Sequence, residues 1–204
     1  MTSRTQRVYL EMGAHWVFAC AVDWPGWCRR GKGEDAALDA LRRYGPRYRA
    51  AIGPPFEAGG LEVVGRVQGN ATTDFGAPAA IGPGDSEPLR GAELERQLAV
   101  LEAAWRAFDA TASRAPTVLR KGPRGGGRDR DPIIEHVREA ERHYASKAGV
   151  RIPPRTAWTE QRSLLATALR RDPAEGSWPH RSTLRRIAWH VLDHAWEIED
   201  RSTG

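Results

Sequence analysis

The sequence contains only two cysteines, Cys20 and Cys28, among its 204 residues. Their spacing is neither C-x-x-C nor a zinc-ribbon pattern, which argues against a cysteine-based redox motif or metal site. A disulfide between them would be unusual in a reducing compartment. Because Cys20 lies in an apolar run, we expect it to be a buried, reduced thiol.

Long apolar runs are also missing, since no stretch approaches the roughly 18 residues that a membrane-spanning helix needs. The first residues, 1–7, contain no hydrophobic region of a signal peptide. The sequence therefore predicts a cytoplasmic protein without a membrane partner. Its net charge is +5, but acidic and basic residues alternate along most of the predicted helices, so a nucleic-acid partner is not expected.

The first third of the chain has the pattern of a small α+β unit. Alternating or continuous apolar residues predict strands over 8–12, 15–22 and 61–67, and the run 15–22 is apolar on both faces, as in a central strand. A helical period begins after Gly33, and Gly45-Pro46 is expected to kink or end that helix.

The rest of the chain is predicted to be helical. Residues 69–90 are rich in glycine and proline and have little periodicity, which indicates a linker between residues 1–68 and 91–204. Asp131-Pro132 is a typical helix start. The basic, glycine-rich stretch 120–130 lacks P-loop order and is interpreted as a solvated loop. Four helices, joined by loops of unequal length, favour a bundle and are expected over 91–113, 131–148, 157–171 and 182–201.

Two histidines on the last predicted helix suggest a metal site. His190 and His194 are four residues apart, so their imidazoles lie one turn apart on the same side of a helix, at the edge of its apolar stripe. His136 occupies the equivalent edge of the helix at 131–148. Three neutral imidazoles would leave open coordination positions on a divalent ion. Two partly exposed surface histidines remain the alternative, and Val191 excludes the H-E-x-x-H protease motif.

The segments 131–144 and 183–197 resemble two helices of the DinB-like four-helix metal-binding proteins. In the first, a histidine precedes a small-acidic-aromatic pattern, and in the second, an arginine precedes an aromatic-His-x-x-x-His run. The resemblance implies that His136, His190 and His194 bind a divalent ion, which would be zinc, nickel or iron. His143, seven residues after His136, is the rival ligand.

The same resemblance implies a reaction class. DinB-like proteins include thiol-dependent transferases and isomerases, so the expected function is metal binding with activation of a thiol or of water, in a transferase, isomerase or hydrolase. The expected partners are a small-molecule thiol or acidic substrate, and a second copy of the chain. Arg185 and Arg186 are candidates for binding an anionic substrate group, with an exposed salt-bridging pair as the alternative. No residue is identified as a general base.

The N-terminal unit resembles HicB-like antitoxin domains. The strand at 17–22, the Pro25-Gly26 turn and the helix after Gly33 carry this resemblance, whereas Trp24 and Trp27 depart from the small residues common there. The complete expectation is an α+β chain with a HicB-like strand and helix unit followed by a DinB-like four-helix bundle. The alternative function is a non-enzymatic binding or regulatory protein whose HicB-like unit meets a protein partner.

Overall fold

The N-terminal third of the chain forms a mixed, four-stranded sheet in the order β3-β2-β1-β4. The computed structural model describes residues 5–54, 56–122 and 126–202. Strand β1 pairs antiparallel with β2 and parallel with β4, and β2 pairs antiparallel with β3. The strands are β1 (Thr5–Met12), β2 (Val17–Ala21), β3 (Cys28–Gly31) and β4 (Gly60–Gln68).

The three predicted strands are present, and the expectation that the second is central is confirmed. Every residue of β2 is buried, because its side chains are apolar on both faces. Strand β3 was not predicted, because its sequence, Cys-Arg-Arg-Gly, shows no alternation of apolar residues. The strand joins the sheet by pairing with β2. Its pairing places Cys28 opposite Cys20, and both thiols are free and buried, as expected for Cys20.

Helix α1 (Glu34–Ile52) connects β3 to β4 and continues through Pro46, so of the two outcomes predicted at Gly45-Pro46, a kink or an end, the end is wrong. A proline inside a helix removes one backbone hydrogen bond, but tertiary packing compensates for it here. The backbone at Gly45 lies so close to Ala58 that a Cβ atom there would come within 2.8 Å of the Ala58 Cβ. The chain that follows the helix therefore packs against the proline-containing turn.

The predicted helices of the second half are all present at nearly the predicted bounds. Helix α4 begins one residue early, after Asp129, because Pro132 is tolerated anywhere in the first turn, where amide hydrogens lack partners in the helix. The segment 69–90 contains a short helix that was missed, capped by the side chain of Asn70. The helices are α2 (Ala71–Phe75), α3 (Gly91–Arg114), α4 (Arg130–Lys147), α5 (Trp158–Ala168) and α6 (His180–Ser202).

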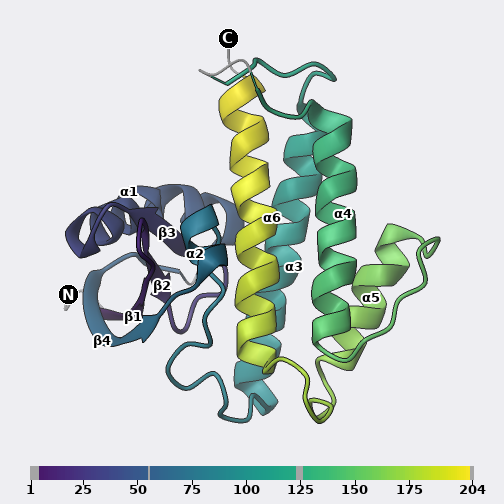
Figure 1. Cartoon of the computed structure of the whole chain (residues 1–204). Helices are drawn as coiled ribbons and strands as arrows, with labels where there is room; N and C mark the ends of the chain where they lie inside the picture. Colours follow the sequence, from purple (N-terminus) through teal and green to yellow (C-terminus); the bar gives the residue numbers. More distant parts are fainter. Residues whose placement is uncertain (1–4, 55, 123–125, 203–204) are drawn as a thin grey trace.

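The chain is α+β, but the expectation of a four-helix bundle is wrong. Helices α3, α4 and α6 lie side by side, whereas the short α5 packs against α4 at the outside (Figure 1). The other flank of α6 and α3 is covered by the sheet and α1 (Figure 1). The physical reason lies in α6, which is buried on almost its whole circumference and therefore needs neighbours on more sides than a bundle helix does.

The sheet and the helices share one hydrophobic core. A single cluster of buried side chains extends from Val8 in β1 through Leu98 in α3 to Ile198 in α6. A second, smaller cluster contains Trp189 of α6 together with Phe18 of β2, whose rings meet edge to face at 6.1 Å. Trp189 therefore faces the N-terminal unit, as its position away from the apolar stripe predicts.

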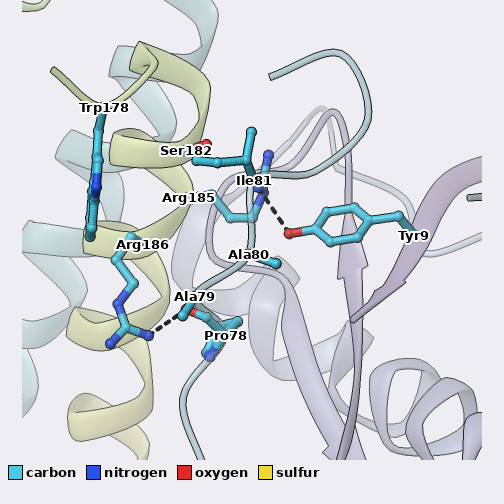
Figure 2. Close-up of a pocket in the computed structure, with 9 residues that line it drawn as sticks. All are labelled: Tyr9, Pro78, Ala79, Ala80, Ile81, Trp178, Ser182, Arg185 and Arg186. Carbon is cyan, nitrogen blue, oxygen red and sulfur yellow. Dashed lines mark hydrogen bonds between the residues drawn. The ribbon is translucent and has the colours of Figure 1, made fainter. Parts of the chain in front are cut away.

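The segment between α2 and α3 runs alongside α6, and two arginines of α6 hold it there (Figure 2). Arg185 forms a buried ion pair with Asp85 and donates a 2.9 Å hydrogen bond to the Tyr9 hydroxyl. Arg186 donates a 2.6 Å hydrogen bond to the carbonyl of Pro78. These contacts tie the segment to both the sheet and the last helix.

Candidate metal centre

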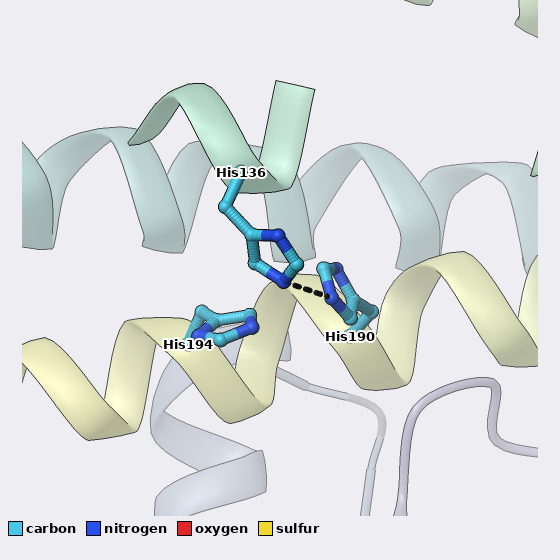
Figure 3. Close-up of side chains that lie close together, drawn as sticks. All are labelled: His136, His190 and His194. Atoms are coloured by element: carbon cyan, nitrogen blue, oxygen red, sulfur yellow. Dashed lines mark hydrogen bonds between the residues drawn. The ribbon is translucent and has the colours of Figure 1, made fainter. Parts of the chain in front are cut away.

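Three histidines from two helices converge where α4 lies beside α6 (Figure 3). His136 comes from the second turn of α4, and His190 and His194 come from consecutive turns of α6. The two α6 imidazoles have ring centroids 4.6 Å apart, and each lies 5.0 Å from that of His136. The structure thus brings together all three predicted ligands.

One pair of histidine nitrogens has the separation that a single metal ion requires, and the third nitrogen lies nearby. One ligand nitrogen from each histidine lies within 4.8 Å of the other two. The Nε2 atoms of His136 and His190 are 3.2 Å apart. Two nitrogens bound to zinc at roughly 2.0–2.1 Å in tetrahedral geometry lie about 3.3 Å apart. The donor set of three imidazoles suits zinc, nickel or iron, which bind imidazole well.

Burial and neighbouring charges favour the neutral, metal-binding form of two candidate ligands, His190 and His136. Burial lowers the pKa of His190 well below its usual value, and the neighbouring His194 and His136 lower it further. Burial and His194 also lower the pKa of His136. Near neutral pH, protons therefore compete little with a metal ion for these imidazole nitrogens.

An outer carboxylate orients the third imidazole. Glu197 lies one turn after His194, and its carboxylate is 2.7 Å from the His194 Nδ1. Arg201 donates a hydrogen bond of 2.7 Å to the other oxygen of Glu197. A carboxylate on one ring nitrogen selects the tautomer whose other nitrogen, here Nε2, is free to bind metal. The pKa of Glu197 is lowered, first by its hydrogen bond to His194, which favours the charged carboxylate.

One imidazole nitrogen at the centre is unsatisfied. His190 is only 7% exposed, and its Nδ1 is buried without a hydrogen-bond partner among the described residues. A buried polar atom without a partner normally costs free energy. This histidine is therefore placed for a role other than maximal stability of the fold.

Aromatic and basic side chains surround His190. The Tyr144 ring meets the His190 ring edge to face at 5.7 Å, and Trp178 stacks on Tyr144. The Arg186 guanidinium lies over Tyr144, 5.1 Å from the ring centroid. Arg186 and Arg128 lie near enough to contribute to the lowered pKa of His190, whereas Glu197 places a negative charge beside His194.

The two arginines predicted to bind an anionic substrate group are in different settings. Arg185 is 5% exposed, and its ion pair with Asp85 joins two buried side chains, so the alternative of an exposed salt-bridging pair does not describe it. Arg186 has no carboxylate partner among the described residues and stands beside the histidines. Both line a small pocket with Tyr9 and Trp178 (Figure 2).

The remaining histidines lie apart from the centre. His143, the rival ligand, is exposed and does not belong to the histidine cluster. His15 lies in the turn between β1 and β2, where its backbone amide donates to Asp74, and His180 is the first residue of α6. Asp193 points away from the centre and pairs with Arg29, as its helical position predicts.

Sequence reasoning missed three participants. Glu197 could have been found as a carboxylate one turn after His194, a spacing that permits contact on a helix. Tyr144 has no local feature that distinguishes it from a packing residue, and Arg128 lies in a stretch without regular structure. Their approach to the histidines depends on how α4 and the preceding loop pack, for which no local signal exists.

Comparisons of the chain with protein families, with curated proteins and with solved structures find no match. Among the described residues, no helix has the length and apolar character required to cross a bilayer.

Proposed function

We propose that this protein binds one divalent metal ion through His136, His190 and His194. The observation that carries the proposal is the convergence of three imidazole nitrogens within 4.8 Å of one another, from two helices that are far apart in the sequence. The lowered pKa values of two of these histidines and the carboxylate on the third support it.

We further propose that the bound ion serves chemistry rather than structure. Three protein ligands leave at least one coordination position open, which is the arrangement of catalytic sites. At such a position the ion lowers the pKa of a thiol or of water and makes it nucleophilic near neutral pH. The resemblance of the two histidine-bearing segments to DinB-like proteins favours a thiol transferase or isomerase over a hydrolase.

Arg186 is the residue of this chain that we assign to the substrate. Its guanidinium lies against Tyr144, which itself contacts His190, so an anionic group held by Arg186 would be close to the centre. Arg185 is already paired with Asp85, and its assignment to substrate binding is therefore the weaker of the two. The buried, free cysteines fit the proposed cytoplasmic location, where thiols stay reduced.

Metal analysis of untagged protein tests the proposal. After exposure to zinc, nickel or ferrous ion and removal of the excess, we expect about one ion per chain in wild type, and less than a tenth of that in His136→Gln, His190→Gln and His194→Gln. Metal should also raise the midpoint of thermal unfolding of wild type, because it binds only the folded chain.

The matched control is His143→Gln, which removes an exposed histidine from the same helix as His136 and should leave metal content unchanged. Circular dichroism of each variant shows whether its helices are retained. If folded wild type acquires none of the three ions, or if the His194→Gln variant binds as much as wild type, the proposal is wrong.

A further inference from the structure

A second pocket lies on the face of α6 next to the one that bears the histidines, and three of its nine lining residues are arginines. It is lined by residues of β2, β3, α1 and α6 and by Gly76, which directly follows α2. Arg29 and Arg30 of β3 and Arg43 of α1 line it, together with aromatic side chains and a single carboxylate, that of Asp193. The pocket has a volume of about 370 Å³.

The charges of this arginine pocket do not balance. Arg29 pairs with Asp193 at 2.5 Å, which neutralises one guanidinium. Arg30 donates only to the carbonyl of Gly76, at 3.1 Å, and Arg43 has no hydrogen bond or ion pair among the described residues. The nearby Asp39 pairs with Arg42 instead. Two positive charges therefore face the pocket without a counter-charge from its lining.

Two arginines are held in place before any ligand binds. The Arg29 guanidinium lies 3.6 Å from the centroid of the Tyr44 ring and 4.5 Å from that of Trp196. Arg30 lies over the Trp16 ring and passes directly beside Gly76, where a Cβ atom would collide with its guanidinium. Such preorganisation reduces the entropy that binding would otherwise cost.

Two donors in the walls have no acceptor among the described residues. The Nε of Arg29 and the indole Nε1 of Trp189 are buried and unpaired. Trp189 is only 6% exposed and lines the same pocket. Unpaired buried donors cost free energy, so these side chains are held against the pocket at a cost to stability.

We propose that this arginine pocket binds the phosphate group of a small-molecule ligand. A phosphate monoester is close to a dianion at neutral pH, which matches the two uncompensated guanidiniums. Guanidinium groups also bind the oxygens of phosphate through pairs of hydrogen bonds. A carboxylate can accept the same pair of hydrogen bonds, but it carries one negative charge where the phosphate dianion carries two. The rings of Phe18, Tyr44 and Trp189 supply contact surface for the remainder of the ligand.

Calorimetric titration of inorganic phosphate tests the proposal. Metal-free protein is used, so that phosphate bound to a metal ion does not contribute, and acetate serves as the singly charged comparison. We expect saturable binding that is tighter for phosphate than for acetate. Arg30→Gln and Arg43→Gln should each weaken it by about tenfold or more, since hydrogen bonds to charged groups are strong.

The matched control is Arg106→Gln, which removes an exposed arginine of α3 that has no ion pair among the described residues and lies outside the pocket, and it should bind phosphate as wild type does. His136→Gln should also bind phosphate normally, and Arg43→Gln should bind metal normally, so this proposal and that of the metal centre fail independently. Absence of phosphate binding at millimolar concentration overturns the proposal. Equal binding by wild type and the Arg30→Gln/Arg43→Gln variant, or binding of an oligonucleotide but not of inorganic phosphate, also overturns it.

Discussion

Single side chains of α6 serve three different surfaces of the molecule. His190 and His194 face α4, Trp189 and Asp193 face the sheet and α1, and Arg185 faces the segment that precedes α3. Consecutive residues of a helix point about 100° apart, so one helix that is buried all round places unrelated chemistry on adjacent residues. The metal centre and the arginine pocket therefore lie on adjacent faces of one helix, and the Trp189 ring of the pocket is 6.2 Å from the His190 ring of the centre.

The buried pair of Arg185 and Asp85 makes the first prediction at this scale. Arg185→Met should lower the free energy of unfolding by about 3–5 kcal/mol, because it leaves the Asp85 carboxylate buried without its partner. Urea denaturation measures the change. Arg90→Ala, which breaks the exposed pair with Asp172, should cost less than about 1 kcal/mol. Similar losses of unfolding free energy in the two variants would contradict the burial of the Arg185–Asp85 pair.

His180 supplies a prediction of pH dependence. Burial lowers its pKa in the folded protein, so the unfolded chain binds the proton more readily. The stability that neutral His180 contributes is complete above the unfolded pKa, about 6.5, and is lost as pH falls through the lower folded pKa. As pH falls below about 6.5, the free energy of unfolding of metal-free wild type should therefore decrease more than that of the His180→Gln variant.

The comparison with His180→Gln isolates one residue. The contribution of the three clustered histidines is common to both proteins and cancels in the difference. A difference in unfolding free energy that stays constant from neutral to acidic pH would show that the two states of the chain protonate His180 equally.

At the scale of elements, the contact between the Pro25-Gly26 turn and α6 joins the sheet to the helices. Gly26 has a φ of 89°, and a Cβ atom there would come within 2.9 Å of the backbone carbonyl carbon of Ala188. Gly33, with a φ of 93°, has the same kind of backbone conformation but open space around it. Comparing the same substitution at the two glycines therefore distinguishes the cost of backbone strain from the cost of a steric clash.

Alanine at these glycines tests the close approach of the turn. Gly33→Ala should cost about 1–2 kcal/mol, which is the strain of a left-handed residue alone. Gly26→Ala should cost about 1–3 kcal/mol more, because the turn or α6 must also move. Chemical denaturation gives both values. Equal losses would mean that the turn does not pack tightly on α6.

At the scale of the whole molecule, one core connects the sheet with the helices. Buried side chains from β1 to α6 form one continuous cluster, and a second cluster bridges β2 and α6 through Trp189. Removing the sheet would expose an apolar flank of α6 to water. Burial of apolar area is the main stabilising contribution to folding, so the helices depend on the sheet for their stability.

Cooperativity of unfolding tests this dependence. The full chain should unfold in a single transition, with the same midpoint by circular dichroism and by tryptophan fluorescence. A fragment of residues 91–204 should keep helical content but lose the cooperative transition. A fragment that unfolds as sharply as the full chain, and at the same midpoint, would show that the helices form an independent domain.

Local sequence was sufficient where the chemistry is local. The apolar stripes of the helices predicted α3, α4, α5 and α6 at nearly their observed bounds, and the spacing of His190 and His194 on one helix face follows from 3.6 residues per turn. Val17–Ala21 could be predicted to be a central strand because both of its faces are apolar. Short elements such as β3 and α2 were missed, because four or five residues show no period.

Tertiary structure alone decided what surrounds α6. The sequence by itself determined that His190 and His194 share a helix face, whereas the packing of α4 against α6 brought His136 to within 3.2 Å of His190. Packing also placed the sheet, rather than a fourth long helix, on the other flank of α6. The periodicity of a helix shows which of its faces are apolar, but the partner that covers each face depends on contacts between residues far apart in the chain.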